Sequence, residues 1–239
     1  MFWLTLRQLR SGSVKGRKKA AQDLWREANP RALSGLAEAA LTDPDADVRQ
    51  VAASALGRLR VPERVEPLMQ VLQDKEPDVV RSAVLGLRGA NDERIIHKLV
   101  PLLRHRDFSV RTSAAQTIDT MRWAPPDREQ RVWFCVAKGW FERAASSGAE
   151  AMPALKLTAE TGPVFAAVRA VEAMGKISDP SVVKVLCDAL HSPEPVVCIA
   201  ATDALGKVGG SEAVTALIPC LKSPHTQIRA ESARALGIL

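Results

Sequence analysis

The chain has 239 residues, of which 46% are apolar and 25% charged, and this ordinary balance excludes an intrinsically disordered protein. The formal net charge is +6, and six basic residues within the acid-free stretch 1–20 account for it, because the other 27 basic residues equal the 27 acidic ones. A groove that holds a phosphate backbone needs basic residues along its length, so this distribution argues against nucleic-acid binding. Aromatic residues make up only 4%, while Ala and Leu supply most apolar positions, which favours closely packed helices over sheets.

No apolar run is long enough to cross a bilayer, and the apolar residues 1–6 are too few for the core of a signal peptide. The four cysteines form no C-x-x-C pair and fall within helical patterns: Cys135, Cys187, Cys198 and Cys220. Such cysteines are typical of small buried apolar residues in a reducing compartment. We therefore expect a cytoplasmic protein.

The N-terminal stretch combines apolar side chains with cations and allows two interpretations. Trp3 and its apolar neighbours, beside these cations, are typical of an anchor for an anionic membrane surface or an acidic partner. The cations are Arg7, Arg10, Lys15, Arg17, Lys18 and Lys19. However, Leu9 precedes Leu41 by 32 residues, the offset that also separates Arg17 from Arg49. This spacing favours a first helix of the first repeat, with the cations on its solvated face and in the following turn.

A helical pattern recurs along most of the chain with a period of 31 residues. Its first full copy contains Val48, Ala52 and Leu56, whose i, i+4, i+8 spacing places them on one apolar stripe of a helix. The later copies are Val79-Ala83-Leu87, Val110-Ala114-Ile118, Ala166-Ala170-Met174, Val197-Ala201-Leu205 and Ile228-Ser232-Leu236. A looser copy over residues 17–24 precedes them all. We expect every stripe to face the core.

Another helix precedes each of these, so the repeating unit is helix–turn–helix. The first helices end at leucines with the same spacing within each half of the chain: Leu41, Leu72, Leu103, Leu190 and Leu221. The turns that follow are rich in proline and acidic residues, which start the next helix because proline fits a first turn and carboxylates favour a helix N-terminus. Glycines near the ends of the second helices are expected to adopt the left-handed conformation that ends a helix. They are Gly57, Gly175, Gly206 and Gly237.

The periodicity breaks over residues 121–148. Arg111 and Ala167 hold equivalent positions only 56 residues apart, fewer than two periods, so one degenerate unit fills the gap. Pro125 and the proline after it end any helix, and Asp127 can cap the next one. Three of the five tryptophans lie in or beside this unit: Trp123, Trp133 and Trp140. The favoured interpretation is that they fill an irregular joint, and the alternative is an aromatic recognition patch.

The predicted fold is all-α, a right-handed α–α superhelix of about eight helix pairs, the fifth irregular. We expect a single solenoid domain over residues 1–239, with regular repeats over 1–120, the Trp-rich unit over 121–148 and regular repeats over 149–239.

The motif acid-x-x-Val-Arg-x-x-Ala-Ala-x-x-Leu-Gly, over residues 45–57, resembles HEAT repeats of the phycobilisome-lyase-like (PBS lyase HEAT-like) type. The resemblance covers nearly the whole chain and implies a solenoid; most members of that family are scaffolds and a few are enzymes. It also implies that arginines and acids at set positions tie successive repeats together. The arginines are Arg17, Arg49, Arg111 and Arg229, and the acids are Asp45, Glu76, Asp107 and Glu194. Because Val80, Ala167 and Cys198 occupy the arginine position elsewhere, we expect this ladder to be interrupted.

The histidines argue against one enzyme of this kind. Deoxyhypusine hydroxylase is a HEAT-repeat enzyme that holds iron with His-Glu pairs, and no histidine of this chain is followed by glutamate. Cys187 and His191 lie one helical turn apart and Cys220 falls on the next repeat, but no second ligand pair has the spacing of a zinc site. No phosphate-binding glycine motif or nucleophile-elbow motif occurs. We therefore predict no catalytic residue, no metal and no cofactor.

The candidate binding surface is the face of the second helices that points away from the first helices. Its side chains lie one, two, five and nine residues after each arginine position. The polar ones, called here the second-helix face, are Gln50, Ser54, Arg58, Arg81, Ser82, Thr112, Ser113, Gln116, Arg169, Glu172, Asp203, Lys207, Glu231 and Arg234. A surface of mixed charge suits a protein or peptide partner better than nucleic acid.

The predicted function is a non-catalytic scaffold or adaptor for protein–protein interaction. One alternative is a HEAT-repeat enzyme subunit resembling bilin (phycocyanobilin) lyases, and a second is a nucleic-acid-binding HEAT-like protein, which the neutral charge after residue 20 disfavours. The chain stops at Leu239 directly after a second helix, without a polar cap. We therefore expect an exposed apolar C-terminal end that is covered by self-association, by a partner or by further residues.

Overall fold

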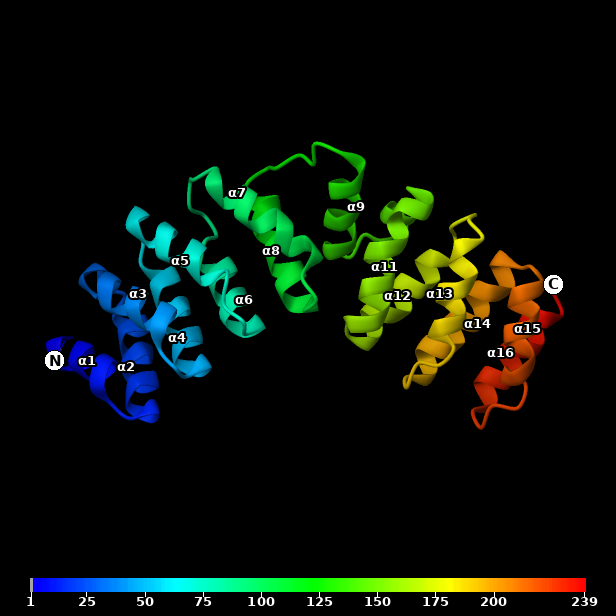
Figure 1. The fold of residues 1–239 in the computed structure, drawn as a ribbon, viewed down its shortest axis with the longest axis horizontal. Helices are drawn as coiled ribbons and strands as arrows, with labels where there is room; N and C mark the ends of the chain where they lie inside the picture. The colour runs from blue at the N-terminus through cyan, green and yellow to red at the C-terminus, as the bar shows by residue number, and fades with distance from the viewer. Residues whose placement is uncertain (1) are drawn as a thin grey trace. The chain divides into compact units, whose positions relative to one another are not determined.

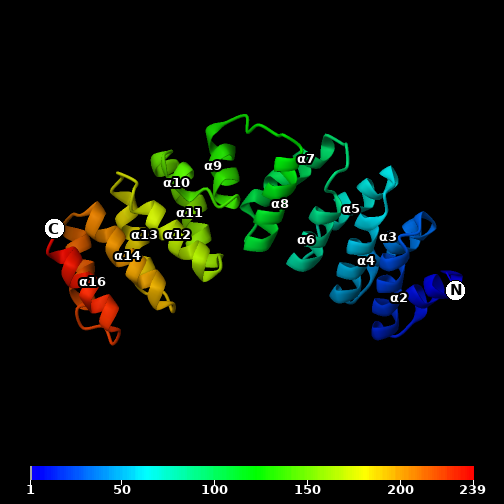
Figure 2. The same ribbon diagram turned by 180° about the vertical axis from the view of Figure 1, so that it is seen from behind.

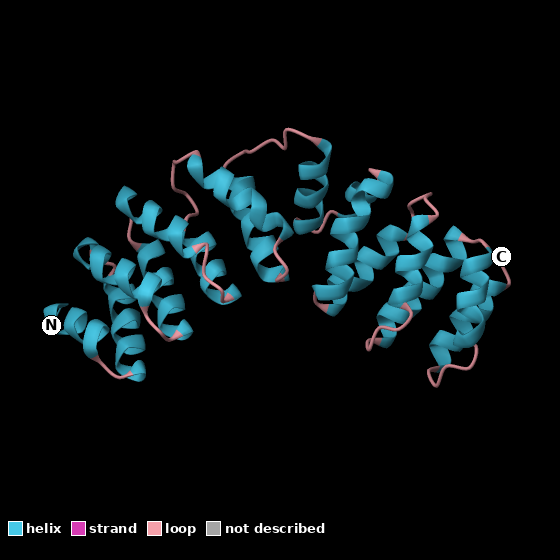
Figure 3. Ribbon diagram, in the orientation of Figure 1, coloured by secondary structure: helices cyan, strands magenta, loops and turns pink. Residues whose placement is uncertain are grey.

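The computed structural model describes residues 2–239, and within them helices joined by loops and turns are the only regular secondary structure (Figures 1 and 3). These residues form sixteen α-helices and four short 3-10 helices, without a β-strand. The helices divide into two compact units, one up to Ala124 and the other from Pro125, called here unit 1 and unit 2. Each unit contains four helix pairs, which confirms the predicted all-α solenoid fold. Among residues 2–239, no helix combines the length and hydropathy that crossing a bilayer requires.

Unit 1 has two layers of helices. The first helices are α1 (Phe2–Ser11), α3 (Leu33–Thr42), α5 (Val65–Val71) and α7 (Arg94–Leu99), and the second helices are α2 (Val14–Glu27), α4 (Ala46–Arg58), α6 (Pro77–Gly86) and α8 (Phe108–Thr120). The 3-10 helices are η1 (Pro30–Ala32), η2 (Pro62–Arg64) and η3 (Val100–Arg104). The second helices pack on one another in chain order, and α1 packs on α3 and α3 on α5 in the other layer (Figures 1 and 2). The helix α1 confirms that the N-terminal stretch forms the first helix of the first repeat.

Unit 2 keeps the two layers despite its irregular first pair. Its helices are α9 (Arg128–Ala137), α10 (Phe141–Ala145), η4 (Gly148–Ala151), α11 (Met152–Thr161), α12 (Val164–Met174), α13 (Ser181–Ala189), α14 (Pro195–Val208), α15 (Ser211–Cys220) and α16 (Thr226–Leu236). Although α10 has only five residues, α9 packs on α11 and α10 packs on α12, as first and second helices of a repeat should. Asp127 caps α9 by accepting the N–H of Gln130 at 2.7 Å, as predicted.

The core of each unit is built from the predicted apolar stripes. Val48, Ala52 and Leu56 are completely buried, and the corresponding residues of the later repeats are buried as well, except for the half-buried Leu236. Ser232 enters its stripe without leaving an unsatisfied hydroxyl, because its Oγ donates to the carbonyl of Ile228 at 2.7 Å.

Replacing Leu87 or Leu205, both fully buried, with alanine should lower the free energy of unfolding by about 2–5 kcal/mol, because the change removes packed methyl groups and leaves a cavity. Denaturant unfolding measures this. Leu85→Ala and Ile218→Ala serve as matched controls, because these side chains are 41% and 54% exposed. An equal loss in all four variants would show that the assigned core face is wrong.

Successive second helices approach so closely that only small residues fit where they cross. A Cβ added to Gly57 on α4 would overlap the Cα of Gly86 on α6. In unit 2, a Cβ added to Gly175 or Gly206 would lie 2.8 Å from the Cβ of Ala204 or Ala235, respectively. These glycines therefore allow close packing between repeats.

The prediction that Gly57, Gly175, Gly206 and Gly237 adopt a left-handed conformation is wrong. Gly57 and Gly206 lie inside α4 and α14, and Gly175 and Gly237 have φ of −63° and −76°. The glycines with positive φ are instead Gly89, Gly139, Gly148, Gly209 and Gly210. A glycine at the end of a helical pattern suggests a helix end. At Gly57, Gly175 and Gly206, however, glycine is required by close packing against the next repeat.

Gly57→Ala should destabilise the protein although alanine is the better helix former by about 1 kcal/mol. The added methyl group has no room against Gly86, and overpacking of this kind costs about 1–3 kcal/mol. Gly237→Ala is the control, because a Cβ there would meet its first neighbour at 3.4 Å. Thermal unfolding of both variants measures the effect. A higher melting temperature for Gly57→Ala would contradict the packing argument.

Candidate functional site

The arginine position of the second helices joins neighbouring repeats in unit 1. Arg17 on α2 forms a bidentate pair with Asp43 in the turn of the next repeat, with Nε–Oδ2 and Nη2–Oδ1 distances of 2.6 and 2.8 Å. Its Nη1 donates to the carbonyl of Gly12, in the turn before its own helix, at 3.0 Å. One planar guanidinium therefore ties its own turn to the following repeat.

Arg49 repeats this arrangement one repeat later. Its Nε and Nη2 bond the carboxylate of Asp74 at 2.6 and 3.0 Å, and its Nη1 donates to the carbonyls of Asp43 and Pro44 at 2.9 and 3.3 Å. The side chains of Arg49 and Asp74 are only 8% and 10% exposed. The pair is therefore shielded from water, which strengthens its electrostatic coupling relative to a surface pair.

The acids that the resemblance assigned to these seams are not the partners of the arginines. Asp45, Glu76, Asp107 and Glu194 all occupy N-cap positions of second helices. Asp45 accepts the N–H of Val48 at 3.1 Å, and Asp107 accepts two N–H groups of α8. Asp43 and Asp74 bind the arginines instead, because their place at the start of the turn puts them opposite the preceding repeat.

Farther along the chain, the arginine keeps its bonds to the turn, although the residue six positions before it is no longer an aspartate. Nη1 of Arg111 and Nη1 of Arg229 donate to the carbonyls six and five residues earlier, at 2.7–2.8 and 2.8–3.1 Å. Burial lowers the pKa of Arg111 to about 10. In the second, third, fourth, seventh and eighth repeats, the residue six before the arginine position is Asp43, Asp74, His105, Ser192 and Ser223, respectively.

The ladder is interrupted where the sequence indicates. Val80, Ala167 and Cys198 occupy the arginine position and are buried. The Cys198 thiol takes over part of the role, because its Sγ lies 3.2 Å from the carbonyl oxygens of both Leu190 and Ser192. The methyl group of Ala167 can make no such bond.

The seam carboxylates of unit 1 are held ionised. Burial alone would raise the pKa of Asp43 and of Asp74, but hydrogen bonds from Arg17 and Arg49, backbone N–H donors and the positive charges bring both pKa values below the ordinary range. A carboxyl whose pKa is lower in the folded state stabilises the fold above its unfolded pKa of about 3.9. That stabilisation is lost as the pH falls through the folded pKa.

Asp43→Asn combined with Asp74→Asn should lower the free energy of unfolding at pH 7 and flatten its decline between about pH 5 and pH 2. Denaturant titrations at several pH values measure both effects. Asp47→Asn is the matched control, since Asp47 pairs with Lys18 on the surface and is 65% exposed. If the double variant declined as steeply as the unchanged protein, the seam pairs would not cause the acid sensitivity.

Most of the second-helix face is accessible in each unit. Its members in unit 1 that are at least partly exposed are Gln50, Ser54, Arg58, Arg81, Thr112 and Gln116. Those in unit 2 are Arg169, Glu172, Asp203, Lys207, Glu231 and Arg234. Ser82 and Ser113 are exceptions, because they are buried to 6% and 8% exposure. Both lie two residues after the arginine position, and their burial removes them from the candidate surface.

Charges of the second-helix face in unit 2 largely neutralise one another. Asp203 pairs with Lys207 on its own helix and with Arg234 on α16, and Arg234 also pairs with Glu231 at 2.8 Å. Burial opposes ionisation of Asp203, but the hydrogen bonds from Lys207 and Arg234 hold its pKa below the ordinary range. A partner must compete with these pairs, which are exposed and individually weak.

In unit 1, the arginines of this face also have contacts. The Arg58 guanidinium lies 4.4 Å from the ring centroid of Trp25, a cation–π contact, and Arg81 pairs with Asp78 at 3.0 Å. The face therefore presents an arginine on an aromatic platform on α4 and α2.

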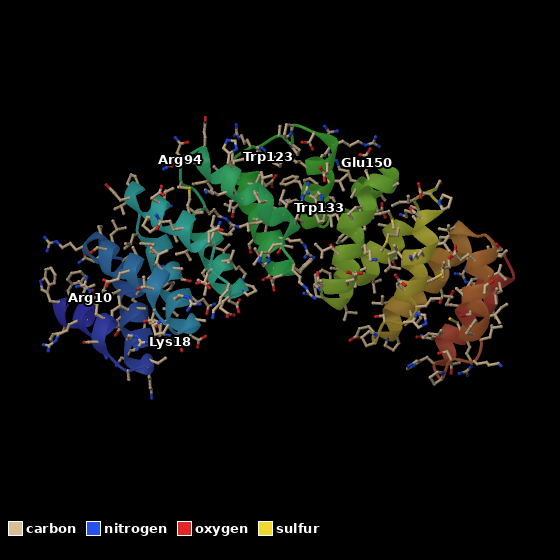
Figure 4. The ribbon with its side chains drawn as sticks, viewed as in Figure 1. Arg10, Lys18, Arg94, Trp123, Trp133 and Glu150 are labelled. Atoms are coloured by element: carbon tan, nitrogen blue, oxygen red, sulfur yellow. The ribbon has the colours of Figure 1, made fainter. Side chains whose placement is uncertain are left out.

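The N-terminal cations have three different environments. Arg17 belongs to the buried seam, while Arg10 and Lys18 form exposed pairs with Glu38 and Asp47 at 3.0 and 2.6 Å; Figure 4 labels both basic residues. The others are exposed and pair with no carboxylate among residues 2–239: Arg7, Lys15 and Lys19. Trp3 and Leu4 on α1 are 73% and 69% exposed.

The tryptophans of the irregular stretch fall into different units. Trp123 belongs to unit 1, and Trp133 and Trp140 belong to unit 2 (Figure 4 labels the first two). Trp140 packs edge-on against Phe134, with ring centroids 6.0 Å apart, and Lys138 and Arg143 lie within 5.5 Å of its ring centroid. Its 41% exposure leaves both the packing and the recognition interpretation open as predictions.

Residues 2–239 contain no group of three or more His, Cys, Asp or Glu side chains placed to hold a metal ion. Nδ1 of His191, one of the residues considered for zinc, lies 3.1 Å from the carbonyl oxygen of Cys187. Burial raises the pKa of all four thiols, including Cys187 and Cys220, which disfavours the thiolate that a metal or a nucleophile needs.

Known proteins place this geometry in context. A family model described as HEAT repeats matches residues 4–88 and 155–237. No curated protein shows a significant sequence match. The fold is similar to that of human deoxyhypusine hydroxylase in complex with glycerol, with 19% identity, 99% of this chain and 95% of that chain covered, and a TM-score of 0.46.

Two further similar structures are assemblies with partners. The complex of CpcE and CpcF of phycocyanin lyase from Nostoc sp. PCC7120 is 18% identical, with 100% of this chain and 95% of that chain covered and a TM-score of 0.35. A designed armadillo repeat protein in complex with the peptide (KR)4 is 18% identical, with 98% of both chains covered and a TM-score of 0.39. At these identities the likeness concerns the fold alone.

Proposed function

Because this chain belongs to the family of HEAT-repeat proteins, we propose that it is a non-catalytic scaffold that binds a protein or peptide partner through the second-helix face. The observation that carries this proposal is the set of exposed, mixed-charge side chains at repeat spacing on successive second helices. Such a surface can supply many separate polar contacts to an extended partner. The four free cysteines support a cytoplasmic location.

The enzyme-subunit and nucleic-acid alternatives have less support. The raised thiol pKa values and the scattered histidines offer no activated nucleophile or converging acid–base pair. The charges of the second-helix face in unit 2 pair with one another, so no continuous basic track for a phosphate backbone forms there.

Two accessory contacts complete the proposal. The exposed Trp3 and Leu4, with the cations of the N-terminal stretch, suit an acidic partner or an anionic membrane surface. At the C-terminal end, Ile238 and Leu239 are 65% and 45% exposed, which suits self-association.

Arg169→Glu combined with Lys207→Glu should reduce recovery of a partner from native lysate about tenfold, because like charges replace complementary ones across the interface. Quantitative pull-down measures this. The control, Lys98→Glu with Lys184→Glu, changes two exposed charges of the same sign on the first helices α7 and α13. A partner recovered equally by both variants, or lost only with the control, would refute binding at the second-helix face.

A further inference from the structure

The seam between the sixth and seventh repeats contains a pocket. It lies at the position that the arginine–aspartate pairs occupy in the seams of unit 1. The cavity of about 400 Å³ lies between the turn at Gly162 and Pro163 and the turn at Ser192 to Glu194. The corresponding cavity of the first seam is lined by Arg10, Glu38, Arg17 and Asp43, with side chains that pair across it. The two cavities can therefore be compared position by position.

Three substitutions distinguish the two seams. Ala167 stands at the arginine position that Arg17 holds in the first seam, and Ser192 stands at the position of Asp43, six residues before the next arginine position. Seven residues before the arginine position, Glu160 replaces Arg10. The seam has thus lost both arginines and the carboxylate of Asp43, and it has gained the carboxylate of Glu160. Its cavity of about 400 Å³ compares with about 340 Å³ in the first seam.

The backbone of this pocket keeps the acceptor that seam arginines use. In the four repeats with an arginine, its Nη1 donates to the carbonyl five residues earlier: Gly12, Pro44, Arg106 and Pro224. Gly162 is the residue five before Ala167, and it lines the pocket. Among residues 2–239, no side chain donates to its carbonyl oxygen. The site therefore offers a carbonyl acceptor in the place where this fold repeatedly seats a guanidinium.

The walls suit the rest of an arginine side chain. Three carboxylates line the pocket, Glu160, Asp188 and Glu194, against one lysine, Lys156, which is 3.7 Å from Glu160. Apolar side chains, among them Val164, Val185 and Val197, line the remainder. An aliphatic stem with a cationic, planar head matches this combination better than an anion or a wholly apolar group.

We propose that this pocket binds an arginine side chain of a partner peptide, in the place of the arginine that the seam itself lacks. This proposal specifies the chemistry of a partner and rests on the scaffold function proposed above. Its residues are separate from the second-helix face, so the two sites can be tested independently.

The probe is the peptide acetyl-Gly-Arg-Gly-amide, titrated into the full chain while backbone amide signals are followed by NMR. We expect saturable shifts that are confined to the residues lining the pocket. The peptides with citrulline or glutamate in place of arginine should bind at least about tenfold more weakly, because citrulline keeps the shape but loses the charge. Equal binding of either peptide, or shifts centred elsewhere, would overturn the proposal.

Variants of the chain provide the second arm. Asp188→Asn should weaken binding of the arginine peptide about tenfold or more, whereas Glu150→Gln, which changes an exposed carboxylate outside both the pocket and the second-helix face, should leave it unchanged. Ala167→Arg with Ser192→Asp should rebuild the seam pair, raise the melting temperature and abolish binding. Retained affinity in the rebuilt seam or in Asp188→Asn would refute the site. If the rebuilt variant does not fold, Asp188→Asn decides alone.

Discussion

The close contact between successive second helices is the constraint from which the other features follow. Where Gly57 meets Gly86, backbone lies against backbone, and in unit 2 glycine meets alanine at the same kind of crossing. This contact sets the distance between repeats. At that distance the turn of one repeat comes within reach of a side chain on the preceding second helix. Arg17 and Arg49 can therefore bond the carboxylates of the following repeat.

The same backbone arrangement gives chemically different seams along the chain. In unit 1 a guanidinium pairs with a carboxylate across the seam, at Cys198 a thiol bonds the turn carbonyls, and at Ala167 a methyl group makes no such bond. The fold tolerates each replacement because helix packing holds the repeats together. The residue at the arginine position can therefore change from one repeat to the next, so that it stabilises some seams and leaves others available for binding.

The helices and their buried stripes could be predicted from sequence because a 31-residue period with i, i+4 spacing has one simple physical interpretation. Val48 and Leu87 show this: both lie where the pattern places them, with no exposure. The pattern failed where a neighbouring repeat decides the outcome. Gly57 resembles a helix end until α6 is seen against it, and Asp43 resembles any turn residue until Arg17 reaches it. Ser82 and Ser113 were misassigned for the same reason, because only packing distinguishes the edge of a helix face from its centre.

The bonds that join repeats also determine how the chain can fold. The seam pairs link residues only 26 and 25 positions apart, and Lys176 with Glu142 spans 34. Contacts of such short sequence separation have a small loop-closure cost, and chains dominated by them fold fast. Two neighbouring repeats can thus pack on each other as soon as both have left the ribosome, because the contacts between them need no distant segment of the chain. Structure is expected to grow outward from any well-packed pair of repeats, and the seams that lack an arginine pair are where that growth should be slowest.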